Sequence, residues 1–251
     1  MVGKILRTHR ITKKDGRTLI VAMDHALQGS FYGLEDIEDV VKKVMEGGAD
    51  AVMVNWGMAK KIAEVIKGQM GLIISIPYDI NYVKLAIKLG ADGIKTTYFG
   101  PIPLSEERLK QIGEIALAAE DWGIPYIVEL VPTDGEGKIL YNIELIKRAA
   151  RIASELGGDI VKTAYIGKSH EYKEVVKACK LPIVIMGGEK MNNLYDFLKM
   201  VRDSLEAGVI GGAIGRNIWQ YKDPKRITEV LIGIIHDGLD VNEALERLKK
   251  G

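Results

Sequence analysis

The run Gly157-Gly158-Asp159-Ile160-Val161-Lys162-Thr163-Ala164-Tyr165 sets the pattern for the rest of the chain. It is a short apolar segment introduced by glycines and an aspartate, with a lysine where a buried strand would hold another Val or Ile. A cationic side chain in such a segment has to be desolvated or paired, and charged residues are seldom buried otherwise. The run therefore predicts a buried strand, and Lys162 is the first candidate for chemistry.

The same unit recurs along the chain. Apolar runs lie at residues 19–23, 51–55, 71–76, 93–97, 125–131, 160–163, 182–187 and 209–215. Helical periodicity separates them, as in residues 35–47, which stop at Gly47-Gly48. Strands that are apolar throughout are typical of a parallel sheet covered on both faces, and eight such strands predict an α/β fold, the (β/α)8 TIM barrel.

We expect one domain over residues 1–251, with the barrel at about residues 18–238. The alternative is a doubly wound open sheet, which would carry a glycine-rich dinucleotide fingerprint after the first strand. The sequence there is MDHALQG instead, which favours the barrel. Residues 1–17 are expected to form a basic surface leader that caps the barrel, and residues 240–250 a last amphipathic helix over the barrel or a neighbour.

Composition narrows the function classes. Thirty-five Lys and Arg residues against 34 Asp and Glu residues leave a formal charge of +1, so no basic field calls for nucleic acid or a membrane surface. Neither a signal peptide nor a membrane-spanning run is recognisable. The single cysteine, Cys179, excludes an intramolecular disulfide and fits a reducing compartment. We therefore expect a cytoplasmic enzyme.

In such barrels the reactive residues follow the carboxyl ends of the strands. The polar residues found there are Asp24 and His25, Asn55, Asp79, Lys95 with Thr96 and Thr97, Glu129, Lys162 with Thr163, Gly187 and Gly188, and Gly215 with Arg216. Because strand side chains alternate, Lys162 should share the inner face with Ile160 and Ala164. Two lysines and two carboxylates are thus predicted to converge on one mouth.

These residues suit amine chemistry. An uncharged lysine can attack a ketone and form a Schiff base, and both desolvation and the like charge of Lys95 favour an uncharged Lys162. The alternatives are a structural ion pair between Lys162 and Glu129, a Lys95 that snorkels to solvent, and an Asp24 that only caps a turn. Glu129 is either a counter-ion or a proton carrier.

Glycines point to a phosphate. Gly187, Gly188 and Lys190 follow the seventh strand, and Gly215 and Arg216 follow the eighth, ahead of a short IWQY helix. Glycines let backbone N–H groups approach phosphate oxygens, and the loops after strands seven and eight are the usual phosphate site in barrels. Each doublet alone could be an ordinary tight turn.

Metal chemistry is not predicted, and neither is a cofactor. His9, His25, His170 and His236 lack the spacing of metal ligands. His25, beside Asp24 at the substrate site, is expected to be a hydrogen-bonded loop residue.

Taken together, MDHALQG, DIVKTAYIG, PIVIMGGEK and AIGRNIWQ resemble, in order and spacing, the archaeal-type class I aldolases. That family includes fructose-bisphosphate aldolases, 2-amino-3,7-dideoxy-heptulosonate synthases and a thiolase acting on a phosphorylated dione. The resemblance implies a TIM barrel in which Lys162 forms a Schiff base with a ketose phosphate and Asp24 accepts a proton. It also implies phosphate binding by the glycine loops and Arg216, and a homo-oligomer, often a decamer.

One position departs from the family. Its aldolases carry a proton-donating tyrosine before a proline at the end of the fifth strand, where this chain has Val131 before Pro132. Valine cannot move a proton, so Glu129, Tyr165, Tyr78 or Tyr98 would have to replace it, or the reaction is a thiolase-type or transaldolase-type transfer. A phosphate-binding isomerase or synthase without a Schiff base, and a non-catalytic member, stay open as alternatives.

Overall fold

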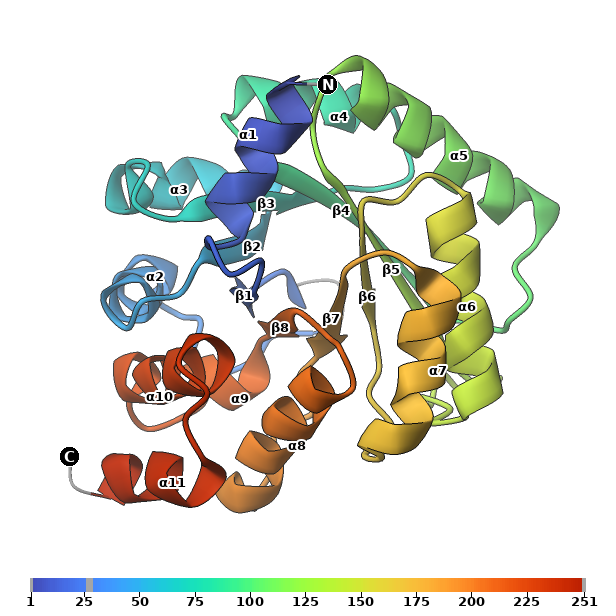
Figure 1. The fold of residues 1–251 in the computed structure, drawn as a ribbon. Helices are drawn as coiled ribbons and strands as arrows, with labels where there is room; N and C mark the ends of the chain where they lie inside the picture. The colour runs from blue at the N-terminus through green and yellow to red at the C-terminus, as the bar shows by residue number, and fades with distance from the viewer. Residues whose placement is uncertain (1, 26–28, 250–251) are drawn as a thin grey trace.

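The computed structural model describes residues 2–25 and 29–249 and confirms the barrel (Figure 1). Its eight parallel strands close in chain order, with β1 paired to both β2 and β8. The strands are β1 (Thr18–Ala22), β2 (Ala51–Asn55), β3 (Gly71–Ser75), β4 (Gly93–Gly100), β5 (Tyr126–Pro132), β6 (Ile160–Thr163), β7 (Ile183–Met186) and β8 (Gly211–Ile214). Each predicted strand is present within a few residues of its expected bounds.

Helices surround this sheet (Figure 1). They are α1 (Val2–Ile11), α2 (Ile37–Glu46), α3 (Trp56–Ile66), α4 (Asn81–Lys88), α5 (Glu106–Asp121), α6 (Ile143–Glu155), α7 (Ser169–Cys179), α8 (Leu194–Glu206), α9 (Arg216–Trp219), α10 (Pro224–His236) and α11 (Val241–Lys249). Cys179 is buried in the core, at the end of α7. Among these helices, none is long and apolar enough to cross a membrane.

Alternation along the strands divides the barrel interior into an apolar floor and a polar mouth. The floor is a cluster of buried side chains: Ile11, Ile20, Ala22, Ala51, Met53, Ile73, Ile127, Ile160, Val184 and Ala213. Lys162 lies two residues beyond Ile160, and Glu129 two residues beyond Ile127, so both point inward one layer above the floor. The floor fills the barrel toward the amino ends of the strands. The charged groups face the cavity at the carboxyl ends.

The leader is more regular than predicted. It forms α1, whose last residue, Ile11, is fully buried and belongs to the apolar floor. The cations of the leader reach three aspartates that each precede a strand: Lys4 pairs with Asp159, Arg10 with Asp92 and Lys13 with Asp50. The predicted cap is therefore a helix fastened by charge. At the other end of the chain, α11 packs on α8 and α10.

Candidate active site

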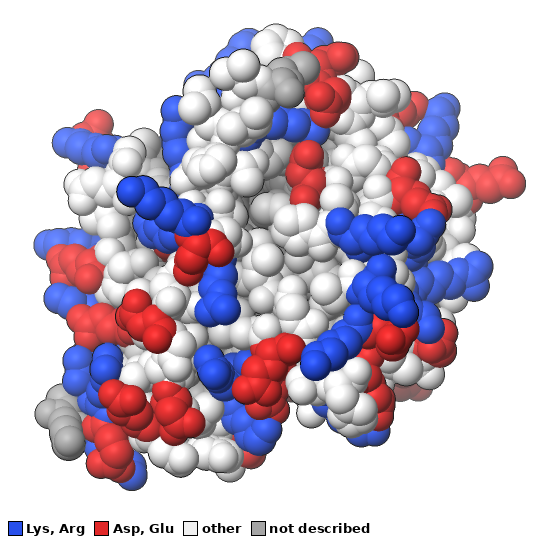
Figure 2. Space-filling view, in the orientation of Figure 1, with Lys and Arg blue, Asp and Glu red and all other residues white. Residues whose placement is uncertain are grey.

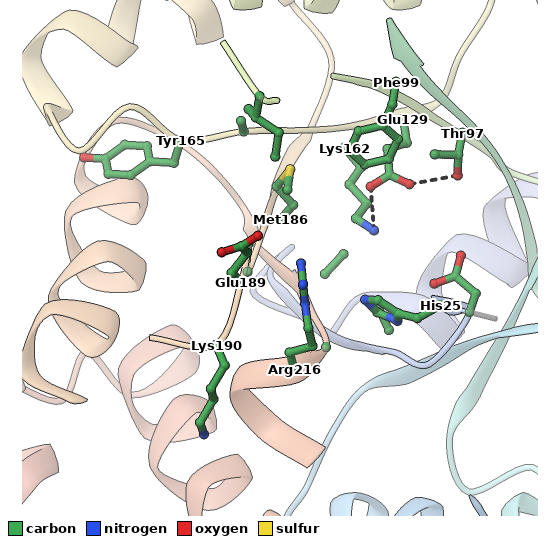
Figure 3. Close-up of a pocket in the computed structure, with 18 of the residues that line it drawn as sticks. His25, Thr97, Phe99, Glu129, Lys162, Tyr165, Met186, Glu189, Lys190 and Arg216 are labelled. Carbon is green, nitrogen blue, oxygen red and sulfur yellow. Dashed lines mark hydrogen bonds and ion pairs between the residues drawn. The ribbon is translucent and has the colours of Figure 1, made fainter. Parts of the chain in front are cut away.

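Ten of the predicted site residues line one cavity at the carboxyl ends of the strands, with a volume of about 1080 Å³ (Figure 3); Asp79, Thr96 and Thr163 do not line it. These residues are Asp24, His25, Lys95, Glu129, Lys162, Gly187, Gly188, Lys190, Gly215 and Arg216. Residues 26–28 of the MDHALQG motif lie outside the described residues. Of the other candidates, Asn55 and Thr97 line the cavity.

Lys162, Glu129, Lys95 and Asp24 form a continuous chain of alternating charge. Lys162 Nζ lies 2.7 Å from Glu129 Oε1, and Lys95 Nζ lies 2.7 Å from Glu129 Oε2. Lys95 Nζ is also 2.6 Å from Asp24 Oδ2. The side chain of each is at most 7% exposed. Thr97 Oγ1 donates a further hydrogen bond of 2.9 Å to Glu129 Oε2.

The strand register explains this contact chain. Thr97 lies beside Glu129 in the β4–β5 pair, and Glu129 lies beside Lys162 in the β5–β6 pair. Neighbouring strands are about 4.8 Å apart, so inward side chains at matching heights are bound to meet. The network therefore follows directly from which residues occupy the layer above the floor.

Charge compensation dominates the electrostatics of the network. Burial alone would raise the pKa of Asp24, but the ammonium groups of Lys95 and Lys162 hold it well below its usual range. The same two lysines outweigh burial and lower the pKa of Glu129. Burial opposes the charge of Lys95, yet Asp24 and Glu129 raise its pKa well above the ordinary value. Both carboxylates are therefore ionised and Lys95 is a fixed cation at neutral pH.

These contacts bear on the alternatives for the network. Lys162 is in an ion pair with Glu129, but the pair opens onto the cavity and is not sealed in the core. Lys95 does not snorkel, since it is only 2% exposed. Because Glu129 and Asp24 already balance its charge, Lys95 is poorly placed to drive a proton off Lys162. The carboxylate in contact with Lys162 is that of Glu129.

His25 differs from expectation, because its Nδ1 atom is buried without a hydrogen-bond partner in the described part of the chain. The ring packs edge-on between Phe31 and Trp219, with centroid distances of 6.0 and 5.5 Å. Desolvation in this aromatic pocket lowers the pKa of His25 to about 4. His25 therefore presents a neutral ring to the cavity.

The glycines of the two loops are required by close packing. A Cβ on Gly215 would lie 2.5 Å from the His25 ring and 2.6 Å from the carbonyl oxygen of Ala22. A Cβ on Gly187 would lie 2.8 Å from the Ile214 side chain, and Gly188 has a φ of +68°. The backbone of both loops can therefore lie at the cavity wall only because these residues are glycine.

The two cations of the predicted phosphate site point in different directions. In Figure 3, Arg216 projects toward the space beside Lys162, whereas Lys190 extends away from it. The Nζ atom of Lys190 lies 5.4 Å from the ring centroid of Tyr221, which holds the ammonium group outside the cavity centre. Arg216 is thus the cation that the structure directs at the reacting group, and Lys190 lines the rim.

The tyrosines considered as proton donors do not reach Lys162. Tyr98 donates to the carbonyl oxygen of Pro101, and the Tyr78 ring packs on Arg108; neither lines the cavity. Tyr165 lines the wall, but Figure 3 shows its hydroxyl directed away from Lys162. Val131 is fully buried in β5. Glu129 is therefore the candidate in contact with the lysine.

Several lining residues were not predicted from the sequence. They include Phe31, Ser75, Tyr141 and Glu189, and behind the wall lies Asn217. Ser75 ends β3, so the rule for strand ends could have found it. Tyr141 and Glu189 lie in loops whose course no periodicity fixes, and only the fold brings them to the cavity.

The cavity holds a lysine in contact with a carboxylate at the open end of a TIM barrel, and the fold together with the family match makes the protein a class I aldolase, a carbon–carbon lyase. The model of the DeoC/LacD family aldolases matches residues 18–221. The chain belongs to this aldolase family, as the sequence resemblance predicted.

Individual proteins of similar sequence or structure support this family assignment. The chain is 34% identical to an uncharacterized aldolase of Saccharolobus solfataricus, over 99% of this chain and 100% of the relative. It is also 34% identical to 2-amino-3,7-dideoxy-D-threo-hept-6-ulosonate synthase 1 of Archaeoglobus fulgidus, over 98% of this chain and 96% of the relative. A Schiff-base-forming fructose-1,6-bisphosphate aldolase superimposes with a TM-score of 0.83 at 27% identity, covering 93% of this chain and 100% of that one.

Proposed function

We propose that the protein makes or cleaves a carbon–carbon bond in a phosphorylated ketose through a Schiff base on Lys162. The observation that carries the proposal is the 2.7 Å contact of Lys162 Nζ with Glu129 at the wall of an open cavity. A nucleophilic amine and its proton acceptor are thereby already within hydrogen-bond distance.

The contact chain suggests how the proton moves. The ammonium of Lys162 gives a proton to Glu129, and the free amine attacks the ketone carbon. Glu129 then returns the proton to the hydroxyl of the carbinolamine, which leaves as water and gives an iminium. Cleavage of the neighbouring carbon–carbon bond leaves its electron pair on the iminium as an enamine, while Asp24 accepts the proton of the substrate hydroxyl that becomes the aldehyde.

Lys95 has a different role in this scheme from the one predicted. Its ammonium bridges Asp24 and Glu129, so it keeps two carboxylates close together that would otherwise repel each other. We propose that Lys95 fixes the geometry of the two proton carriers. Glu129, not Lys95, is proposed to make Lys162 neutral, by accepting the proton of its ammonium group.

The phosphate of the ketose is proposed to bind at Gly187, Gly188, Gly215 and Arg216, with Lys190 at the rim. Three features support this: the glycine backbone at the wall, the inward Arg216, and the position of both loops after β7 and β8. Phosphate binding there would hold the carbonyl carbon near Lys162.

Fructose 1,6-bisphosphate is the first substrate to test, since it is named for the structural relative. Val131 favours a second candidate, a transaldolase-type or thiolase-type transfer, because the strand-five position of the family's tyrosine cannot donate a proton. The candidates differ in the fate of the fragment left on the enzyme: the lyase protonates the enamine and releases it as a ketone by hydrolysis, whereas a transaldolase-type enzyme adds the enamine to a second aldehyde. A thiolase-type enzyme would instead pass an acyl group to a thiol.

Borohydride trapping tests the Schiff base. Dihydroxyacetone phosphate with borohydride should add the mass of the reduced adduct to the peptide that carries Lys162, and Lys162→Met should abolish it. If wild-type Lys162 stays unmodified, the lysine is only an electrostatic anchor, as in an isomerase or synthase. If no ketose phosphate turns over at all, the chain is a non-catalytic member.

We also propose a homo-oligomer, the state that the sequence resemblance implies. Val2, Ile5 and Leu6 on α1 are apolar and more than half exposed, which supports a covered surface there. Light scattering after size exclusion measures the mass directly, and a monomer would contradict the proposal.

A further inference from the structure

The wall behind the predicted phosphate site depends on a residue that does not line the cavity. Asn217, in the first turn of α9, is 3% exposed and follows Arg216 directly. Its Nδ2 group donates to the carbonyl oxygens of Gly187 and Glu189, each at 2.9 Å. Its Oδ1 atom accepts a hydrogen bond of 2.8 Å from the N–H of Met191. One buried side chain thus holds the loop after β7 at three backbone groups.

These contacts orient the loop. In a planar trans peptide, the C=O of one residue points opposite to the N–H of the next. The carbonyl of Gly187 points at Asn217, so the N–H of Gly188 points the other way, and the same holds for Glu189 and the N–H of Lys190. The whole segment from Gly187 to Lys190 lines the cavity, whereas Asn217 does not and lies on the other side of it. The two N–H groups therefore face the cavity while the two carbonyl oxygens face away from it.

Such an arrangement suits an anion. Carbonyl oxygens at the wall would repel a phosphate, and N–H groups would bind it. Asn217 donates hydrogen bonds to the two carbonyl oxygens of the loop. Without these bonds, the desolvated carbonyl groups would destabilise this conformation of the loop. A second contact holds α9 itself in place: Trp219 Nε1 donates a hydrogen bond of 3.0 Å to the carbonyl oxygen of Ala22, at the end of β1.

We propose that Asn217 is the positioning residue of the phosphate site, which turns the N–H groups of Gly188 and Lys190 toward the bound phosphate. The inference rests on the proposed function for the identity of the anion. It gives three consecutive residues separate tasks: Gly215 leaves room, Arg216 supplies charge, and Asn217 sets the direction of the neighbouring loop.

The test compares a phosphorylated ketone with its unphosphorylated counterpart. The half-saturating concentration for borohydride trapping is measured with dihydroxyacetone phosphate and with dihydroxyacetone. In Asn217→Ala we expect the value for the phosphate ester to rise at least tenfold and the value for dihydroxyacetone to stay within twofold. A variant whose fold is disturbed in general would raise the half-saturating concentrations of both ketones by the same factor. An unchanged ratio between the two would overturn the proposal.

Two further variants guard the result. Asn217→Leu keeps the approximate size of the side chain and adds no charge but loses the hydrogen bonds to the loop, so it should show the same selective loss if Asn217→Ala does not fold. Asn193→Ala is the matched control, because Asn193 caps α8 just beyond the same loop and is not in the cavity wall. It should leave the ratio within twofold of wild type.

Binding of inorganic phosphate, measured by calorimetry, separates this inference from the Schiff base. If wild type binds phosphate and Asn217→Leu, which adds no charge, binds it at least tenfold more weakly, the positioning role stands even where no adduct forms on Lys162. If phosphate binds equally to both proteins, or not to wild type, the positioning role is refuted, whatever trapping shows.

Discussion

Both ends of this barrel place carboxylates beside cations, but they do so differently. At the base, the side chains of Asp50, Asp92 and Asp159 each accept a hydrogen bond from a backbone N–H of the preceding strand, at 2.6, 3.1 and 2.8 Å. Their lysine and arginine partners come from the leader (residues 1–17), and Asp50 also contacts His236 of α10. At the mouth, Asp24 and Glu129 contact Lys95, and Glu129 contacts Lys162.

The difference separates structure from function. The base acids tie backbone to backbone and connect the leader to three strand–helix units, so their charge is committed to the fold. The mouth acids and lysines hold one another beside open space, where a substrate can replace a partner. Figure 2 shows the remaining acidic and basic side chains mixed over the visible face, in line with the formal net charge of +1. Substitutions at the mouth should therefore lower the catalytic rate, whereas substitutions at the base should lower the free energy of unfolding.

Lys162→Met should have the largest effect. Without the amine no iminium can form, so turnover of a ketose phosphate should fall by on the order of 10⁴-fold or more. Initial rates and intact-protein mass after borohydride trapping measure this. Lys13→Met is the matched control at the base, since Lys13 also pairs with a buried aspartate; it should keep full activity. Trapping that survives in Lys162→Met would place the reacting amine elsewhere.

Glu129→Gln should come next. The amide keeps the shape of the side chain but cannot take a proton from Lys162, so the rate of adduct formation should fall by about 10²- to 10⁴-fold. Single-turnover trapping with dihydroxyacetone phosphate isolates that step from product release. Should trapping proceed at the wild-type rate, Glu129 would be a counter-ion and the proton would leave by another route.

At the base, Asp50→Asn should lower stability and leave activity nearly unchanged. It weakens the contacts of one carboxylate with Leu19 N–H, Lys13 and His236. We expect the free energy of unfolding to fall by about 3 kcal/mol, as when one partner of a buried pair is removed, while kcat changes less than twofold. Urea unfolding and initial rates on the same sample check both. A large loss of kcat without a loss of stability would mean that the two ends are not separate.

The sequence predicted the barrel and the inner layer of the mouth for one physical reason. Strand side chains alternate, and parallel strands end together, so Lys162 and Glu129 could be placed inward from position alone. The same logic covers Lys95, which lies on β4, whereas Asp24 lies two residues beyond the end of β1.

What the sequence did not predict depends on side-chain direction. Lys190 follows the glycines as expected, yet it turns to Tyr221. His25 was expected to form a hydrogen bond, yet aromatic packing holds it. Asn217 looks like one more polar residue of a short helix, and only the contact with two carbonyls of another loop shows its use. Contacts between loops that are 30 residues apart leave no periodic signal.

The pH dependence of stability offers a smaller test of the base. Both ring nitrogens of His236 face carboxylates, with Nδ1 2.8 Å from Asp15 and Nε2 2.9 Å from Asp50. Hydrogen bonding to Asp50 raises the pKa of His236, against burial. Its contribution to stability should be complete below the unfolded pKa of about 6.5 and lost as the pH rises through the raised folded pKa.

Unfolding free energies between pH 5.5 and 9 measure this contribution. His236→Gln should flatten the decline that wild type shows with rising pH. His170→Gln, whose side chain is 80% exposed, should decline as wild type does. A wild-type decline that His236→Gln leaves unchanged would assign the titration to another group.

The smallest expected effect concerns a carboxylate at the phosphate site. Glu189 and Arg216 both line the cavity, and Figure 3 shows them projecting into the same part of it. Because a negative charge there repels a phosphate, Glu189→Gln should tighten binding of inorganic phosphate by about two- to fivefold, the range of an exposed charge interaction. The gain should shrink at high salt, where exposed charges are screened. Calorimetry at low and high ionic strength resolves the two cases, and Glu136→Gln, on the loop after β5, serves as the control. Weaker phosphate binding in Glu189→Gln would mean that Glu189 orients Arg216, so that the mouth, like the base, would use a carboxylate to hold a cation in place.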